Sequence, residues 1–431
     1  MNKETLKYIY QQFLERSLPA YYARNYTLPL GSGKILTLVG VRRSGKTFLL
    51  FELIDELKAQ GVQPEQIIYL NFEDDRLHPI QNGELDLILH AHGELFPHTI
   101  NKKRYLFFDE VQNVPDWQRY VRRIYDTENV EIFLTGSSSK LLVRDISTAL
   151  RGRTIFREVF PLSFNEFLHF KKLSYTPYSR NDELRMHNAL EEYVAWGGLP
   201  EVVLADPSLR PLILEEYTSL LLFRDLIERY QVRNEPVMRY LLKLCFSNPA
   251  TLISAHKVYR DLNSAGYKVS KNTIYEYLHY LEDAYIVFSC PLHTSSVQKQ
   301  EQNPRKYYVI DTGLIQAYRA EPERDRGRKL ENVVFLHERY SSKEIFYYKN
   351  KHEIDLVIGE QPQRFLNVTW SLEDRATAKR EYDATLFGKE KFSSSEGKLL
   401  SHEGWERISA EKRFDVFSAW KYLLKTSGKK K

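Results

Sequence analysis

The segment GVRRSGKT at residues 40–47 constrains this chain more than any other part of its sequence. It has the spacing G-x-x-x-x-G-K-[ST] and ends in Lys46 and Thr47. The residues before it, KILTLV (34–39), predict a short buried strand, and the leucines after it repeat at helical spacing as far as Gly61. Between a strand and a helix, such glycines allow backbone N–H groups to surround an anion, so the segment predicts a phosphate-binding loop.

The loop residues predict a site for ATP. Lys46 is expected to reach the β- and γ-phosphates, and the Thr47 hydroxyl is expected to ligate magnesium. Arg42 and Arg43 are expected either to assist at the phosphates or only to form ion pairs with nearby acids. The complete set expected to bind ATP is Gly40, Val41, Arg42, Arg43, Ser44, Gly45, Lys46, Thr47 and Phe48.

Two acidic residues end a second apolar strand, RYLFFDE (104–110). Asp109 is suited to hold Mg²⁺, directly or through water, and Glu110 to orient or deprotonate the water that attacks the γ-phosphate. A third strand, EIFLTGS (131–137), ends in hydroxyls, so Ser137, with its neighbours Thr135 and Ser138, is a candidate γ-phosphate sensor. The alternative for these residues is an ordinary turn.

Arg151 and Arg153 follow the third of these strands. Either could act as an arginine finger toward the chain's own nucleotide or a neighbour's, and the alternative is a pair of surface arginines. A further strand is predicted for IIYLNFE (67–73), and a helix is predicted between residues 117 and 125. The alternation predicts a parallel α/β sheet with its site at the carboxyl ends of the strands.

The ordered series GVRRSGKT, NFEDDRL, FFDEVQNVPDW, LTGSSSKLL and LRGRTIFREVFPLSFNEFL resembles the AAA-type prokaryotic P-loop ATPases. The resemblance continues through AWGGLPEVVL (195–204), FRDLIERY (223–230) and YVIDTGLI (308–315). It implies an AAA+-like core, a helical lid, a winged helix and a small C-terminal α/β module. The divisions expected are a helical segment at 1–30, the ATPase domain at 31–165, the lid at 166–247, the winged helix at 248–322 and the C-terminal module at 323–431.

Residues 250–310 predict a winged helix-turn-helix by their own pattern, with two amphipathic helices followed by a strand, a polar tip and a return strand. This segment carries seven basic and five acidic residues, which is a weak signal for nucleic acid. Double-stranded DNA and a protein partner therefore both remain candidates. The residues expected to contact DNA are Lys271, Asn272, Tyr275, Lys299, Arg305 and Lys306.

The residues after 325 resemble a restriction-endonuclease-like core. By that resemblance Glu331 is the helix acid and Asp355 the acid of the first strand. The acid-x-lysine expected on the next strand falls on Asn367-Val368-Thr369, so one carboxylate and one lysine are missing. The module is therefore expected to be an inactive nuclease-like fold, and its last residues are a basic tail.

Composition limits the remaining choices. The net charge is +5, no apolar run approaches the ~20 residues that span a bilayer, and two cysteines cannot form a disulfide framework. These features favour a cytoplasmic protein without a membrane segment. The sequence predicts a magnesium-dependent AAA+-type ATPase that couples its nucleotide state to DNA or protein binding, with self-association left open. The alternatives are an ATP-gated switch that does not hydrolyse ATP and, less favoured, an ATP-dependent nuclease.

Overall fold

The computed structural model describes residues 1–81, 83–137, 150, 152–318, 325–393, 395–404 and 415–425. The chain divides into two compact units, Met1–Val159 and Phe160–Lys431, and each contains hydrophobic clusters of its own. Within the described residues, no helix has both the length and the apolar character needed to cross a membrane.

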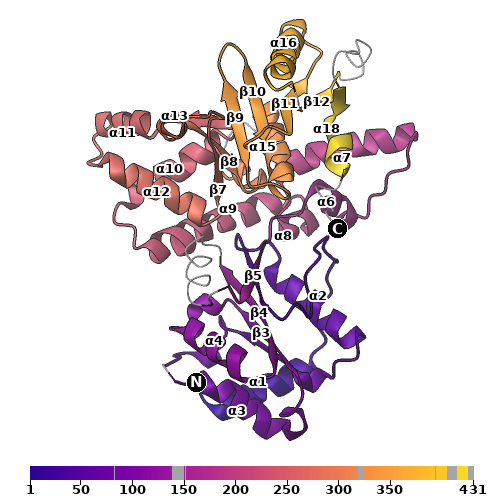
Figure 1. Ribbon diagram of the computed structural model, residues 1–431, viewed down its shortest axis with the longest axis vertical. Coiled ribbons are helices and arrows are strands. Elements are labelled where there is room, and N and C mark those ends of the chain that lie inside the picture. Colours follow the sequence, from indigo (N-terminus) through magenta and orange to yellow (C-terminus); the bar gives the residue numbers. More distant parts are fainter. Residues whose placement is uncertain are drawn as a thin grey trace. The chain divides into compact units, whose positions relative to one another are not determined.

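The N-terminal unit is built on a five-stranded parallel sheet in the order β2-β3-β4-β1-β5 (Figure 1). The strands are β1 (Ile35–Gly40), β2 (Ile67–Asn71), β3 (Arg104–Asp109), β4 (Val130–Ser137) and β5 (Thr154–Glu158). The α-helices are α1 (Lys3–Glu15), α2 (Lys46–Ala59), α3 (Asp86–Leu95) and α4 (Trp117–Thr127). The 3₁₀ turns among the described residues of this unit are η1 (Pro64–Gln66), η2 (Asp75–Leu77), η3 (Pro97–Thr99) and η4 (Val111–Asn113).

Both faces of this sheet are buried, because helices cover each of them. Successive side chains of a strand point to opposite faces, so Leu106 and Phe108 of β3 join the cluster that includes α3 and α4. Phe107 joins the cluster formed by α2 instead. Two-sided burial explains the nearly continuous apolar runs of β1 and β3 in the sequence.

The predicted α/β fold of this unit is confirmed, and the four predicted strands correspond to β1, β2, β3 and β4. The fifth strand, β5, was not predicted. It lies at the edge of the sheet, its side chains are only partly buried, and its sequence TIFRE has no continuous apolar run. An edge strand of this kind lacks the pattern that reveals a central strand.

His92 on α3 should make the N-terminal unit sensitive to acid. Burial lowers the pKa of His92 from 6.5 to about 4, and its Nε2 lies 2.9 Å from the carbonyl oxygen of Glu65. Above about pH 6.5 this histidine is neutral in both the folded and the unfolded chain. As the pH falls toward 4, only the unfolded chain gains the proton, so folding stability is lost.

We expect His92 to contribute about 2–3 kcal/mol to the loss of unfolding free energy between about pH 7 and pH 4.5. Urea unfolding at the two pH values would measure the loss. The control is His92→Gln, which keeps a hydrogen-bond donor and does not titrate. Equal losses in the parent and the variant would contradict the assignment.

The C-terminal unit begins with helices, as expected for residues 166–247. They are α6 (Phe164–Phe170), α7 (Arg180–Trp196), α8 (Pro200–Leu204), α9 (Arg210–Leu220), the π-helix η5 (Leu221–Glu228) and α10 (Glu235–Ser247). The FRDLIERY motif therefore lies largely on a π-helix, a rare conformation that is frequent at functional sites.

A three-stranded antiparallel sheet follows, in the order β6-β8-β7. Its elements are β6 (Thr251–Ile253), α11 (Ala255–Ser264), α12 (Lys271–Asp283), β7 (Val287–Cys290), α13 (Val297–Gln302) and β8 (Arg305–Val309). The short helix α14 (Gly313–Gln316) comes next. The expected polar tip between the last two strands contains α13, which was not predicted.

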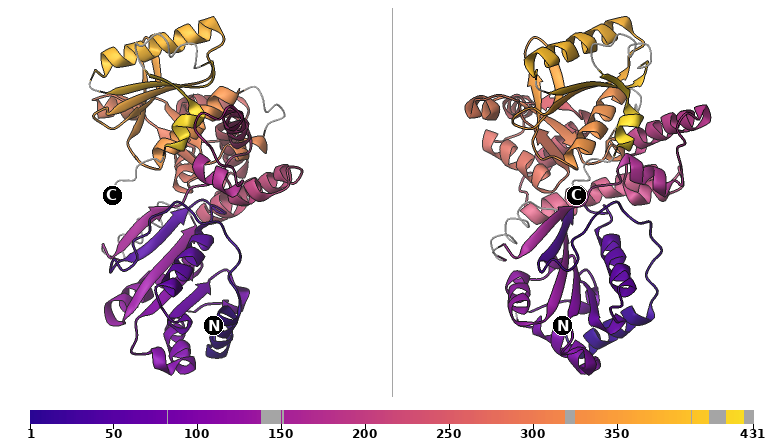
Figure 2. Two further views of the ribbon diagram at one scale, coloured as in Figure 1. Left: turned by 90° about the vertical axis from the view of Figure 1, so that its right-hand side faces the viewer. Right: turned by 45° about the vertical axis from the view of Figure 1, so that its right-hand side comes forward.

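The last part is a mixed sheet in the order β13-β12-β11-β10-β9. The strands are β9 (Ile345–Lys349), β10 (Glu353–Ile358), β11 (Arg364–Ser371), β12 (Glu396–Glu403) and β13 (Asp415–Ser418). The helices are α15 (Arg326–Arg339), α16 (Arg375–Lys391) and α18 (Ala419–Leu424). Figure 2 shows α16 lying across this sheet. A Cβ at Gly388 of this helix would lie 2.5 Å from the Phe365 ring and 3.0 Å from the Ile354 side chain.

Candidate functional site

The phosphate-binding loop leaves the carboxyl end of β1 and turns into the first residue of α2. Gly40 is required where it stands, because a Cβ there would lie 2.1 Å from the carbonyl oxygen of Val159. Inside the loop, Ser44 is buried, and its carbonyl oxygen accepts a hydrogen bond of 2.9 Å from Nη1 of Arg24. The loop therefore reaches the amino end of α2 in a fixed conformation, which is the geometry that binds phosphate oxygens.

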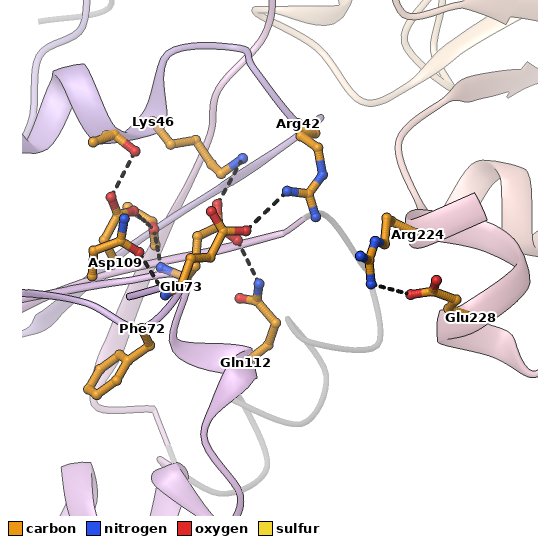
Figure 3. A network of polar contacts seen from close by, with 12 residues as sticks. Arg42, Lys46, Phe72, Glu73, Asp109, Gln112, Arg224 and Glu228 are labelled. Atoms are coloured by element: carbon orange, nitrogen blue, oxygen red, sulfur yellow. Dashed lines mark hydrogen bonds and ion pairs between the residues drawn. The ribbon is translucent and has the colours of Figure 1, made fainter. Parts of the chain in front are cut away.

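Lys46 is buried and folds back over the loop (Figure 3). Its ammonium donates to the carbonyl oxygens of Gly40, at 3.1 Å, and Val41, at 3.2 Å. Oε1 of Glu110 lies 3.9 Å from the same ammonium. The expected phosphate-binding lysine and the expected water-orienting carboxylate are thus brought together.

Asp109 ends β3 as an acceptor for three hydroxyl groups. Its Oδ2 accepts from Thr47 at 2.8 Å and from Tyr69 at 3.0 Å, and its Oδ1 accepts from Thr135. Burial and the charge of Glu110 raise the pKa of the Asp109 carboxyl. The three donated hydrogen bonds lower this pKa but do not cancel the rise. Burial and the charge of Asp109 also raise the pKa of Tyr69, which keeps its hydroxyl a donor.

The donor set around Asp109 fits magnesium. Mg²⁺ prefers oxygen ligands at 2.0–2.1 Å in octahedral geometry, so two neighbouring ligand oxygens are about 2.9 Å apart. Oγ1 of Thr47 and Oδ2 of Asp109 are separated by 2.8 Å. Both oxygens would serve as ligands with little movement.

Glu110 has a strained backbone, with φ 54° in the left-handed region. For a residue with a Cβ this conformation costs about 1–2 kcal/mol, and such strain is frequent at functional sites. The Glu110 N–H donates to Oγ1 of Thr135 at 2.9 Å, and Nε2 of Gln112 donates to the carboxylate at 2.6 Å. These contacts hold the carboxylate near Lys46.

The remaining loop residues lie around this centre. Nη1 of Arg42 forms an ion pair of 3.1 Å with Oε1 of Glu73 (Figure 3). An ion pair with a nearby acid was one of the two roles predicted for Arg42. Arg43 has a positive φ of 62°. Phe48, in the first turn of α2, leaves 42% of its surface exposed and packs edge-on against Phe51.

Arg153 is not at this site. Its backbone carbonyl accepts from Ile35 N at 2.8 Å, at the start of β1, and its guanidinium pairs with Asp126 at 2.9 and 3.1 Å. The two ends of β1 are about 16 Å apart. Arg153 lies beside the first residue of β1, whereas the phosphate-binding loop follows the last residue of β1. The expectation of a finger toward the chain's own nucleotide is therefore wrong for Arg153.

Of the expected γ-phosphate sensor, only the backbone of Ser137 is described, and it pairs with Gly40. Ser138 and Arg151 lie outside the described residues. Among the hydroxyls predicted at the end of this strand, the one that contacts Asp109 belongs to Thr135. The parallel register pairs Phe108 with Leu134, so the next residues, Asp109 and Thr135, lie side by side on neighbouring strands. This strand pairing indicates that Thr135 is a neighbour of Asp109.

Arg24, Tyr69 and Gln112 belong to the site but were not predicted. Arg24 lies far ahead of the loop in the sequence and has no motif around it, and Tyr69 is one of several aromatic residues on buried strands. Only the pairing of β2 beside β3 reveals Tyr69 as a neighbour of Asp109.

The residues expected to contact DNA have different environments. Lys271, Asn272 and Tyr275 are exposed on α12, and Lys299 is exposed on α13. Arg305 is half-buried and pairs with Glu301 at 2.7 Å. Lys306 is buried among Glu331, Glu353 and Asp355, so the expectation that it contacts DNA is wrong.

The motif FRDLIERY also has a defined local structure. Arg224 is exposed and pairs with Glu228 at 2.8 Å, whereas Asp225 is buried.

The parallel sheet, the loop at the carboxyl end of β1 and the acids at the end of β3 define a P-loop ATPase domain of the AAA type. A family model described as an AAA domain matches residues 32–168, and a model of a domain of unknown function matches residues 187–325. An uncharacterized protein of Methanocaldococcus jannaschii, MJ1544, is 33% identical over 417 residues, which cover 93% of this chain and 90% of that protein. The chain belongs to the same family of AAA-type P-loop proteins as MJ1544.

Other likenesses are more distant. An uncharacterized protein of Haemophilus influenzae is 31% identical over 305 residues, covering 70% of this chain and 73% of that protein. Among solved structures, the Walker-type ATPase PABY2304 of Pyrococcus abyssi is 15% identical, with a TM-score of 0.42, and the match covers 74% of this chain and 95% of that one. Drosophila ORC bound to AT-rich DNA and Cdc6 is 12% identical, with a TM-score of 0.22 over 73% and 92% of the two chains.

Proposed function

We propose that this protein is a magnesium-dependent ATPase whose nucleotide state controls the binding of double-stranded DNA. The observation that carries the ATPase part is the convergence of Lys46, Thr47, Asp109 and Glu110 at one end of the parallel sheet. Lys46 would neutralise the β- and γ-phosphates, and Glu110 would orient and deprotonate the attacking water.

Thr47 and Asp109 would hold the magnesium ion, which supplies charge neutralisation between the phosphates. The protein's own groups would bind the phosphates and orient the attacking water. Backbone N–H groups of residues 40–47 would bind phosphate oxygens, and the ammonium of Lys46 would leave the carbonyls of Gly40 and Val41 to meet the γ-phosphate. Gln112, which donates to Glu110, would keep the carboxylate directed toward the attacking water.

The DNA part rests on residues 250–310. Two successive helices, α11 and α12, beside a β6-β8-β7 sheet support a winged helix-turn-helix, in which the second helix enters the major groove. On α12, Lys271, Asn272 and Tyr275 are exposed at helical spacing and would supply phosphate and base-edge contacts. Glu276 is exposed on the same helix, but its carboxylate accepts from Tyr280.

We further propose that the C-terminal sheet is a restriction-endonuclease-like module without cleavage activity. Asn367 and Thr369 lack the carboxylate and the lysine that this chemistry needs. Asn367 instead accepts a hydrogen bond from the backbone N–H of Asp355 at 3.3 Å. Plasmid DNA incubated with the protein and Mg²⁺ or Mn²⁺ should remain intact, and nicking that disappears in Asp355→Ala would contradict the proposal.

The main experiment is steady-state ATP hydrolysis with and without duplex DNA, at two salt concentrations and two protein concentrations, with Lys46→Ala as the blank. We expect turnover that rises with DNA, and a rise that weakens at high salt, because phosphate contacts release counterions. Lys271→Ala with Tyr275→Ala should remove the stimulation and leave the basal rate, whereas Lys299→Ala should have a smaller effect.

The outcomes separate the alternatives. Turnover without stimulation would favour a protein partner over DNA, and a specific rate that rises with protein concentration would indicate self-association with a finger in trans. ATP binding without turnover above the blank would contradict the ATPase and favour a nucleotide-gated switch.

A further inference from the structure

Three carboxylates converge on the ammonium of Lys306 inside the C-terminal unit. Its Nζ lies 3.1 Å from Oε1 of Glu331, 2.9 Å from Oε1 of Glu353 and 3.1 Å from Oδ1 of Asp355. Glu331 belongs to α15 and the other two acids to β10, whereas Lys306 comes from β8 of the three-stranded sheet. The Lys306 side chain is only 3% exposed, so carboxylate oxygens have replaced its water.

These carboxylates are held in place by other groups as well. The Tyr308 hydroxyl donates to Oε1 of Glu331 at 2.7 Å, and the Val368 N–H donates to Oδ2 of Asp355 at 3.0 Å. Lys349 pairs with Oε2 of Glu353 at 3.0 Å. The three acids would therefore keep much of this arrangement without Lys306.

Negative charge is in excess around Lys306. Among the described residues, Lys306 and Lys349 face three carboxylates, and the nearby Glu381 is paired with Arg380 at 2.7 Å. A cation at this point is strongly favoured.

We propose that the Lys306 ammonium occupies a cation-binding site formed by Glu331, Glu353 and Asp355, and that it excludes divalent cations from this site. Convergent carboxylates are the ligands that Mg²⁺, Mn²⁺ and Ca²⁺ take in proteins. The oxygens now lie about 3 Å from the nitrogen, and a shift of about 1 Å would bring them to the distance that a small divalent cation needs. This inference does not depend on the proposed ATPase activity, because the site shares no residue with the phosphate-binding loop.

The test is to remove the ammonium with Lys306→Met, which keeps an unbranched side chain and leaves the carboxylates. Mn²⁺ binding would be counted from the loss of the free-ion electron paramagnetic resonance signal, without nucleotide. We expect the variant to bind one more Mn²⁺ per chain than the parent, with an affinity at least about tenfold higher than any binding the parent shows at this site. The thermal midpoint of the variant should rise with Mn²⁺ more than that of the parent.

Two control variants fix the location. Lys306→Met with Asp355→Asn should lose the additional Mn²⁺, and Lys299→Met, which removes an exposed lysine, should bind no more than the parent. Equal Mn²⁺ binding by Lys306→Met and the parent would overturn the proposal. Mn²⁺ binding by the parent that disappears in Asp355→Asn and is less than about tenfold weaker than that of Lys306→Met would also overturn it, because the lysine would then not exclude the ion.

If Lys306→Met does not fold without a cation, because three acids would be buried together, the readout is the yield of folded protein after refolding with and without Mn²⁺. Recovery only with Mn²⁺ would support the proposal, and failure under both conditions, with the parent refolding in both, would overturn it.

Discussion

Replacing Glu110 by glutamine is expected to lower kcat for ATP hydrolysis by about 10²–10³-fold, the effect of removing a general base. The affinity for ATP should change little, because Lys46 and the loop backbone make the phosphate contacts. The glutamine amide has the size of the carboxylate and can still accept the Gln112 hydrogen bond, but it cannot take a proton from water. Single-turnover hydrolysis and fluorescent-nucleotide titration would measure the two quantities.

Glu73→Gln is the matched control for this change. Glu73 is also an acid near the phosphate-binding loop, but its carboxylate pairs with Arg42 at the surface and not with the groups around Lys46. We expect its kcat to stay within about threefold of the parent. If Glu110→Gln hydrolysed ATP at the parental rate, Glu110 could not be the base.

The second large effect is expected at Asp311, which is buried in the C-terminal unit. Its carboxylate accepts from the Gly198 N–H at 2.6 Å and the Gly313 N–H at 2.8 Å, and from the N–H groups of Leu199 and Leu314. Asp311→Ala would leave these buried donors without an acceptor. Since each unsatisfied donor costs about 1–3 kcal/mol, we expect a loss of about 3–5 kcal/mol, measured by urea unfolding.

Asp206 provides the control for this prediction. It accepts from the Ser208 N–H at 2.9 Å, two residues along, as Asp311 does from Gly313, but it lies at the surface. Asp206→Ala should cost less than about 1 kcal/mol, because water can replace the carboxylate. Equal losses at the two positions would contradict the prediction.

Gly197→Ala tests the same contact from the other side. A Cβ at Gly197 would lie 1.8 Å from Oδ1 of Asp311, and the residue has φ 77°. We expect it to destabilise the chain to an extent comparable with Asp311→Ala. The motifs AWGGLPEVVL and YVIDTGLI, which are separated by more than 100 residues, therefore meet at one buried contact between Asp311 and Gly197-Gly198.

The central strands and the phosphate-binding loop could be predicted because their causes are local. The spacing of Gly40, Gly45 and Lys46 sets the loop, and two-sided burial gives β1 and β3 continuous apolar runs. The position of Asp109 beside Thr47 followed from the rule that carboxyl ends of parallel strands lie at one edge. β5 escaped prediction because an edge strand has a weak pattern.

What the sequence by itself determined is the class of the N-terminal unit and the identity of its main polar residues, since a glycine loop and a strand ending in acids depend on neighbours along the chain. Only the tertiary structure decided where Arg153 and Lys306 lie. β5 begins beside the start of β1, which takes Arg153 to the edge of the sheet away from the loop. Lys306 lies 25 and 49 residues from two of its acidic partners, and a lysine in a sequence carries no sign of whether its ammonium meets water, DNA or buried carboxylates.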